Sequence, residues 1–404
     1  MTIKNIYSYI IIILWSFSTA ATARDLASQA TPINNIDHQY ETILINALGK
    51  IKDNKIDNAL SDLEHLVKIN PDFKLAQLIY ADLLLAQSRP ITDFGNYSAS
   101  SYENIAALRD EARVRWQHHL TPHTDNKIPA SLVQVSDQQK YIVVVDLEAS
   151  RLYLFQNQEG LPALINDFYV TIGKNGTGKF EEGDQKTPTG VYFITGFIKP
   201  DELPDLYGDG AFPIDYPNVW DVRHNRTGYG IWLHGTPSNT YSRPPRDSNG
   251  CVILSNQDLN ALAPYLETNI TPVILTRKIN WIPVTEWKKR YTDYMQLVEQ
   301  WRKDWESRDA ELYLRHYSKD YVGLGKDYKS WVEYKRQVNP SKRFIKVNIT
   351  DTSMFLYPGV PGLLVVTFEQ DYNSDNFHKR FVKRQYWKKE KDGQWKIIYE
   401  GSVS

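Results

Sequence analysis

Residues 141–146 read Tyr-Ile-Val-Val-Val-Asp, and this apolar run sets the character of the middle of the chain. Residues branched at Cβ favour strands, and a short apolar run bounded by turn residues is typical of a buried strand. Similar runs follow at 151–155, 167–172, 190–194 and 230–233, with turn residues between them. The sequence therefore predicts a mostly-β domain over residues 138–277.

Residues 36–120 carry apolar side chains at helical spacing instead. Leu60, Leu63 and Leu66 share one helix face, and Asn70-Pro71 stops one helix before the next begins. This pattern predicts a helical hairpin of the tetratricopeptide type. A single hairpin cannot bury its own apolar face, so we expect it to pack on a neighbouring domain, as a structural cap or as a docking site for a partner protein.

Residues 291–404 read as a helix followed by strands. Tyr294, Leu297, Trp301 and Trp305 fall at helical spacing. Strand patterns follow at 344–349, 362–368, 379–387 and 394–398. A helix packed on a curved antiparallel sheet gives an α+β, cystatin-like domain. The short junction at 278–290 predicts that this domain is closely coupled to the central one.

Composition excludes several classes of protein. Of the 404 residues, 42% are apolar and 24% are charged, which is typical of a globular chain and not of a disordered or polytopic membrane protein. Lys and Arg number 47 against 48 Asp and Glu, so the net charge of −1 predicts no nucleic-acid partner. With Cys251 alone, no intramolecular disulfide or Cys/His zinc site can form, and we expect no metal and no cofactor.

Residues 1–23 have the layout of a secretory signal peptide. Lys4 precedes an apolar run at 7–17, and Ala-Thr-Ala at 21–23 is a small-x-small cleavage site. The apolar run is shorter than the ~20 residues that span a bilayer. We therefore expect cleavage and export to the periplasm rather than membrane anchoring.

The strongest candidates for chemistry are His-Gly-Thr at 234–236 and Ser-Asn-Gly-Cys at 248–251. A Cys251 thiolate can attack a carbonyl while the His234 imidazole takes and returns a proton. Gly250 permits close approach of the backbone, and nearby amides can hold an oxyanion. The separation of 251 − 234 = 17 residues is also compatible with a buried, inert Cys and an unrelated His.

Other motifs near this pair point less clearly to function. Gly-Lys-Asn-Gly-Thr-Gly-Lys at 173–179 fits G-x-x-x-x-G-K, but Phe180 and acidic residues follow it, which predicts a loop and not a nucleotide site. The acids at 184–221 single out no pair for glycoside hydrolysis. Arg243 and Arg246 can bind a substrate carboxylate or simply solvate a loop.

The central region resembles the YkuD-type L,D-transpeptidase family. The matching pieces, in order, are Ile-Val-Val-Val-Asp at 142–146, Thr-Ile-Gly at 171–173, Lys-Thr-Pro-Thr-Gly at 186–190, Ile-Trp-Leu-His-Gly-Thr at 231–236 and Ser-Asn-Gly-Cys at 248–251. The sequence departs from the family at Asn249 and Ile253, where many members have His and Arg. The stretches 211–218 and 228–235 look like the cell-shape subgroup, which adds a C-terminal domain similar to nuclear transport factor two.

The resemblance implies a sandwich-like catalytic domain that acts on peptidoglycan stem tetrapeptides. Cys251 would attack the diaminoacid carbonyl, with His234 as base, the Gly235 carbonyl orienting the imidazole, and amides near Gly250 and Cys251 holding the oxyanion. The substrate contacts that we expect are Trp232, Tyr216, Arg243, Arg246, Ser248 and Asn249.

Three outcomes stay open at the level of sequence. An amine that accepts the acyl group gives a cross-link, as in an L,D-transpeptidase. Water gives a trimmed tripeptide, as in the L,D-carboxypeptidases of the cell-shape subgroup. A non-catalytic scaffold would instead use the helical and C-terminal domains to bind envelope proteins or wall.

Overall fold

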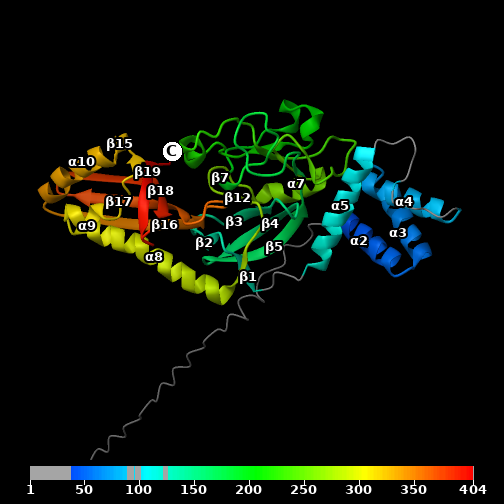
Figure 1. The fold of residues 1–404 in the computed structure, drawn as a ribbon, viewed down its shortest axis with the longest axis horizontal. Helices are drawn as coiled ribbons and strands as arrows, with labels where there is room; N and C mark the ends of the chain where they lie inside the picture. Colours follow the sequence, from blue (N-terminus) through cyan, green and yellow to red (C-terminus); the bar gives the residue numbers. More distant parts are fainter. Residues whose placement is uncertain (1–37, 89–94, 96–101, 122–125, 404) are drawn as a thin grey trace, which may run out of the picture. The chain divides into compact units, whose positions relative to one another are not determined.

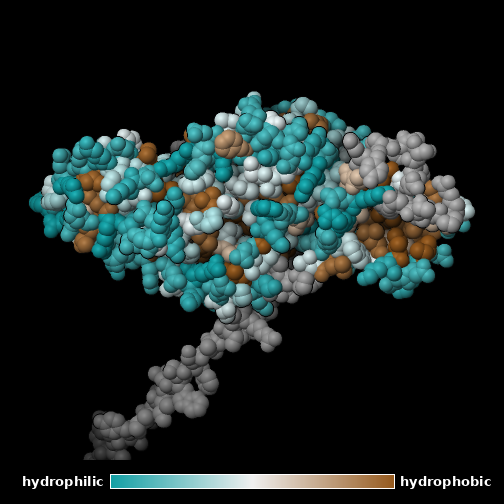
Figure 2. All heavy atoms as spheres, viewed as in Figure 1, coloured by the Kyte–Doolittle hydropathy of each residue, from teal (hydrophilic) through white to brown (hydrophobic). Residues whose placement is uncertain are grey.

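The computed structural model describes residues 38–88, 95, 102–121 and 126–403 (Figure 1). The expected signal peptide at 1–23 lies outside the described residues. In the part of the chain that is described, no helix is both long and apolar enough to cross a bilayer. Figure 2 shows hydrophilic side chains over most of the face that it draws, with apolar residues in smaller areas between them.

The N-terminal helical region that the sequence predicts is confirmed, and it contains more than one pair of helices. The helices are α2 (Gln39–Lys52), α3 (Ile56–Ile69), α4 (Lys74–Ala86) and α5 (Tyr102–Leu120). Leu63, Leu66 and Ile79 lie in their shared core. The apolar face that a single hairpin would expose is thus covered by the other helices of this region and by contacts with the central domain.

The central region is β-rich, as its apolar runs predict. Its main sheet has the order β5-β4-β3-β12-β7, and two smaller sheets have the orders β11-β9-β8 and β10-β6. The elements are β3 (Tyr141–Asp146), β4 (Arg151–Gln158), β5 (Leu161–Tyr169), β6 (Ile172–Gly173), β7 (Gly190–Phe193), β8 (Ala211–Pro213), α6 (Val219–Arg223), β9 (Trp232–His234), β10 (Arg246–Ser248), β11 (Val252–Ile253), α7 (Asn256–Leu262), β12 (Pro272–Thr276) and 3-10 turns at Pro200–Glu202, Asp205–Tyr207 and Ala263–Tyr265.

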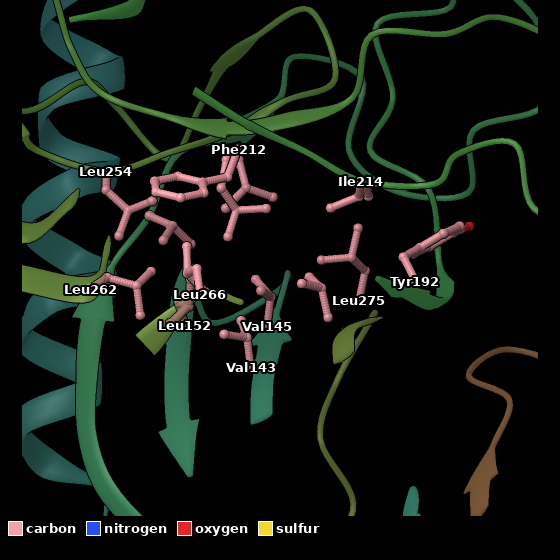
Figure 3. Close-up of a cluster of buried hydrophobic side chains, with 14 of the residues drawn as sticks. Val143, Val145, Leu152, Tyr192, Phe212, Ile214, Leu254, Leu262, Leu266 and Leu275 are labelled. Atoms are coloured by element: carbon pink, nitrogen blue, oxygen red, sulfur yellow. The ribbon is translucent and has the colours of Figure 1, made fainter. Parts of the chain in front are cut away.

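One hydrophobic cluster packs the small β11-β9-β8 sheet against the main sheet (Figure 3). Val143 and Leu275 of the main sheet lie in the same buried cluster as Phe212 of β8 and Leu254, which follows β11. Leu262 closes it from α7. Because β9 and β11 are held by this core, the residues at their ends have fixed positions.

The C-terminal domain has the predicted helix and four long antiparallel strands. The sheet order is β19-β18-β17-β16-β2, and α8 lies along it in Figure 1, with Trp301 of α8 and Phe368 of β17 in one core. The elements are α8 (Val284–Glu306), α9 (Ala310–Leu314), β14 (Val322–Gly323), β15 (Lys326–Asp327), α10 (Tyr328–Ser341), β16 (Ile345–Leu356), β17 (Leu363–Ser374), β18 (Phe377–Lys389) and β19 (Trp395–Ser402). α9 and α10 were not predicted from the sequence.

Two short strands that precede the central domain join it to the C-terminal one. β1 (Lys127–Pro129) pairs with β13 (Trp281–Pro283), and β2 (Leu132–Gln134) adds a fifth strand beside β16. A second hydrophobic cluster contains Val144 of the central sheet together with Leu363 of the C-terminal sheet. The two domains therefore share a core, as the short junction predicts.

Candidate active site

The ends of two parallel strands bring the candidate nucleophile and base to one face. β9 ends at His234, and β11 begins directly after Cys251, with Val252 opposite Leu233. Continuing this register by one residue places Cys251 beside Trp232, two positions before His234 on the neighbouring strand. Residues two apart on a strand share a face and are separated by about 6.6 Å along it. The two side chains therefore project from the same side of the sheet.

His234 is held as a neutral base. Its ring Nδ1 lies 2.7 Å from the carbonyl oxygen of Gly235. A carbonyl can only accept, so Nδ1 carries the proton and Nε2 keeps its lone pair. The side chain is buried, with the Tyr207 ring edge-on at 5.0 Å between centroids. Burial lowers the pKa of His234 to about 4, and the positive charge of Arg243 acts in the same direction.

Cys251 rests as a neutral thiol. Its Sγ donates to the carbonyl oxygen of Gly230 at 3.4 Å. Burial raises the pKa of Cys251 to about 11, although the Trp232 N–H and the charges of Lys179 and Arg243 favour the thiolate. Among the described residues, no hydrogen bond joins this thiol to the imidazole. The thiol proton therefore lies in the hydrogen bond to Gly230 and not in one to His234.

The turn before Cys251 is fixed by one serine. Ser248 Oγ donates to the carbonyl oxygen of Cys251 at 2.7 Å and accepts the N–H of Gly250 at 3.0 Å. Gly250 has φ +128°, and a Cβ there would lie 2.9 Å from the carbonyl oxygen of Lys186, so only glycine fits. Of the two amides expected to hold an oxyanion, that of Gly250 is thus already bonded. The N–H of Cys251 has no acceptor among the described residues and remains as a donor.

The glycine-rich stretch at 173–179 is a loop, as predicted, and no helix follows it. Lys179 is almost fully buried and forms an ion pair with Asp184 at 2.8 Å. The same carboxylate accepts the N–H groups of Phe180 and Lys186. Lys179 therefore closes its own loop and places a positive charge near the Cys251 sulfur.

Asn256 is a positioning residue that was not predicted from the sequence. Its Oδ1 accepts the N–H of Asp209 and of Thr236, both at 3.1 Å, and its Nδ2 donates to the Thr236 carbonyl at 2.9 Å. A Cβ at position 235 would lie 2.0 Å from that Oδ1, so Gly235 is required here. No local sequence pattern predicts this contact, because the first turn of α7 brings Asn256 to the end of β9, which is distant in sequence.

The expected substrate contacts are placed unevenly. Arg246 and Asn249 are exposed, whereas Trp232 and Arg243 are half-buried at the site. Tyr216 is 5% exposed, and its hydroxyl donates to the Thr227 carbonyl at 3.0 Å, so its ring serves the core and not an open surface. The Ser248 hydroxyl is committed to the turn described above.

Two positions that depart from the family pattern also differ in burial. Ile253 is 2% exposed and belongs to the small sheet, while Asn249 faces solvent. In the described part of the chain, no group of three or more His, Cys, Asp or Glu side chains is gathered as metal ligands would be.

Two known domain families match parts of this chain. The L,D-transpeptidase catalytic domain family, YkuD, matches residues 140–275. The Cds6 C-terminal NTF2-like domain family matches residues 293–401. No curated protein matches the chain.

Solved structures extend this agreement over most of the chain. Bd1075 of Bdellovibrio bacteriovorus is 33% identical, with a TM-score of 0.62 over 69% of this chain and 98% of that one. The helical cell shape determining protein Pgp2 of Campylobacter jejuni is 23% identical, with a TM-score of 0.57 over 69% of this chain and 96% of that one, which shows the shared fold. This chain belongs to the family of L,D-transpeptidase-domain proteins that carry a C-terminal NTF2-like domain.

Proposed function

We propose that this protein is a cysteine-dependent acyltransferase that cleaves the diaminoacid–D-alanine bond of peptidoglycan stem tetrapeptides. The observation that carries the proposal is the placement of Cys251 and His234 on one face of parallel strands, with the imidazole locked by Gly235. Membership of the L,D-transpeptidase family supports the substrate class. The likeness to a cell-shape determining protein supports a role in cell shape.

The described residues can support a two-step transfer. Nε2 of His234 takes the thiol proton while the sulfur of Cys251 bonds to the carbonyl carbon. The Cys251 N–H stabilises the oxyanion, and collapse breaks the C–N bond as His234 returns the proton to the leaving D-alanine amine. The resulting thioester is then attacked by an acceptor, whose proton passes to His234 before the thiol is regenerated.

Product analysis tests the proposal and identifies the acceptor. The full chain is incubated with purified tetrapeptide muropeptides, and the products are separated and weighed by mass spectrometry. We expect cross-linked dimers and free D-alanine, which indicate an amine acceptor. Tripeptide without dimers would assign water as the acceptor and carboxypeptidase action. Unchanged tetrapeptide would contradict the enzyme and leave a non-catalytic scaffold.

The pH dependence of the reaction should carry the signature of a neutral pair. Because the pKa of His234 is lowered to about 4 and that of Cys251 is raised to about 11, kcat/KM should stay level from about pH 5.5 to 8.5. It should fall only as pH approaches 4, where the imidazole gains a proton. Circular dichroism at each pH separates this loss from unfolding. An acid limb at pH 6.5 or above would contradict the neutral pair.

We also propose that the protein works in the periplasm. The predicted signal peptide at 1–23 supports export, and peptidoglycan lies in that compartment. Envelope proteins that bind the helical or C-terminal domain are proposed as further partners.

A further inference from the structure

The segment 236–247, here called the linking segment, joins the base at the end of β9 to the turn that carries Cys251. Its middle residue Tyr241 is partly buried and packs against the apolar core of the N-terminal helical region. The ring of Tyr241 packs on Phe73 at 4.5 Å and edge-on against Tyr40 at 5.4 Å, between centroids. Its N–H donates to the carbonyl oxygen of Asp72 at 3.2 Å. The helices therefore pack directly against a loop residue of the central domain.

The next residue is held by a buried charge. Ser242 is 7% exposed, and its hydroxyl donates to Glu111 of α5 at 2.7 Å. Glu111 also forms an ion pair with Arg115 at 2.9 Å, and both of these side chains are at most 2% exposed. Arg115 in turn bonds Glu41 of α2 at 2.8 Å. Two helices thus anchor one serine of the linking segment through the buried Glu111–Arg115 pair, which Glu41 extends.

Arg243, the next residue, links the anchored part of the linking segment to His234 and Cys251. Tyr169 and Thr171 donate to the carbonyl oxygen of Arg243 at 2.9 and 2.8 Å, and the Arg115 guanidinium lies 3.7 Å from the centre of the Tyr169 ring. The charge of Arg243 lowers the pKa of both His234 and Cys251. Movement of the linking segment would therefore change the electrostatics of the reacting pair.

We propose that the N-terminal helices form a brace that holds the linking segment in its catalytic conformation, with Glu111, Tyr241 and Ser242 as positioning residues. Glu111 and Ser242 are buried, and the Tyr241 ring packs against Phe73 and Tyr40. The activity readout below rests on the proposed acyl transfer, whereas the exchange readout does not. The two matching domain families cover residues 140–275 and 293–401 and do not include the helical region.

The test uses full-length variants that loosen the grip from the side of the linking segment. Tyr241→Ala and Ser242→Ala should lower kcat by on the order of 10- to 100-fold with KM little changed, because small misplacements of reacting groups are costly. Amide hydrogen exchange within 236–247 should accelerate in both variants, since local opening becomes easier. Ser238→Ala, an exposed serine of the same segment, should match the parent protein.

Conservative variants separate positioning from a merely structural role. Tyr241→Phe keeps the ring and Ser242→Thr keeps a hydroxyl, so both should recover most of the activity. In Ser242→Ala the acid limb of kcat/KM should also move to higher pH, because a displaced Arg243 no longer depresses the pKa of His234. Glu111→Gln should reproduce these effects from the helix side. If Glu111→Gln does not fold, the result for Ser242→Ala decides for or against the brace.

The outcomes are distinguishable from those of the proposed function. Parent-like kcat and parent-like exchange in Tyr241→Ala and Ser242→Ala would overturn the brace. If the parent protein itself shows no acyl transfer, the proposed function fails, and exchange in the linking segment alone then decides for or against the brace.

Discussion

Replacing Cys251 with alanine should reduce D-alanine release from tetrapeptide by at least about 10³-fold, because the residual rate then comes from binding and oxyanion contacts alone. Cys251 is the single cysteine of the chain, so no other thiol can substitute. The measurement is release of D-alanine by the purified variant under conditions of enzyme excess. Mass spectrometry of the parent protein after rapid acid quenching should show the acyl group attached, and the variant should lack it.

His234→Ala should produce a loss of similar size, since nucleophile and base act as a unit. The matched control is His224→Ala, because His224 also bonds a main-chain carbonyl through Nδ1, that of Trp220 at 2.8 Å, but lies at the end of α6. Thermal unfolding of all variants should remain close to that of the parent. Undiminished turnover in Cys251→Ala or His234→Ala would remove the mechanism.

Replacing Glu400 with glutamine should destabilise the C-terminal domain by about 3–5 kcal/mol, because it leaves buried positive charge without its partner. Glu400 is 1% exposed and forms an ion pair with Lys383 at 2.7 Å. Gln385 and Tyr317 also donate to it, at 2.7 and 3.1 Å. A second lysine, Lys335, is buried nearby. Burial lowers the pKa of Lys335 to about 7, although the negative charge of Glu400 raises it. Chemical denaturation followed by tryptophan fluorescence measures the loss.

The pH dependence of this effect has a definite sign. Although burial alone raises the pKa of Glu400, the charge and hydrogen bonds of Lys383 hold it below its ordinary value of 4.5. The stabilisation is therefore complete above that value and lost as pH falls through the folded-state pKa. The control Glu311→Gln removes a solvent-exposed ion pair with Arg336 and should change stability very little. Equal stability of Glu400→Gln and the parent protein would contradict the prediction.

Local pattern was enough to predict the three-part fold. Long apolar runs such as those of β3 and β17 are recognisable in the sequence, because strands that are buried on one or both faces carry apolar side chains there. α10 was missed because its buried positions include Lys335 and Asn339, which interrupt the apolar periodicity. β2 was missed because three residues are too few to show a period, and its partner β16 lies far along the chain.

For the candidate site, the sequence predicted the identities of the two main residues but not their environment. The His-Gly and Ser-x-Gly-Cys motifs predicted Cys251 and His234 as candidate nucleophile and base, because acyl transfer of the proposed kind needs a thiol and an imidazole. The directions of their pKa shifts could not be read from sequence, since burial arises from packing around the finished fold. The contacts of Asn256 and Ser242 were equally hidden, because each joins segments that are distant in sequence.

The fifth strand of the C-terminal sheet has a consequence for biosynthesis. Gln134 of β2 pairs with Met354, a separation of 354 − 134 = 220 residues. At ~5–20 residues per second, a ribosome needs roughly 10–40 s to make the intervening chain. During that interval β2 has no partner strand, so the C-terminal domain completes its sheet with a strand that was synthesised long before the others. A fragment that starts at the junction would lack that piece and would leave β16 as an unprotected edge.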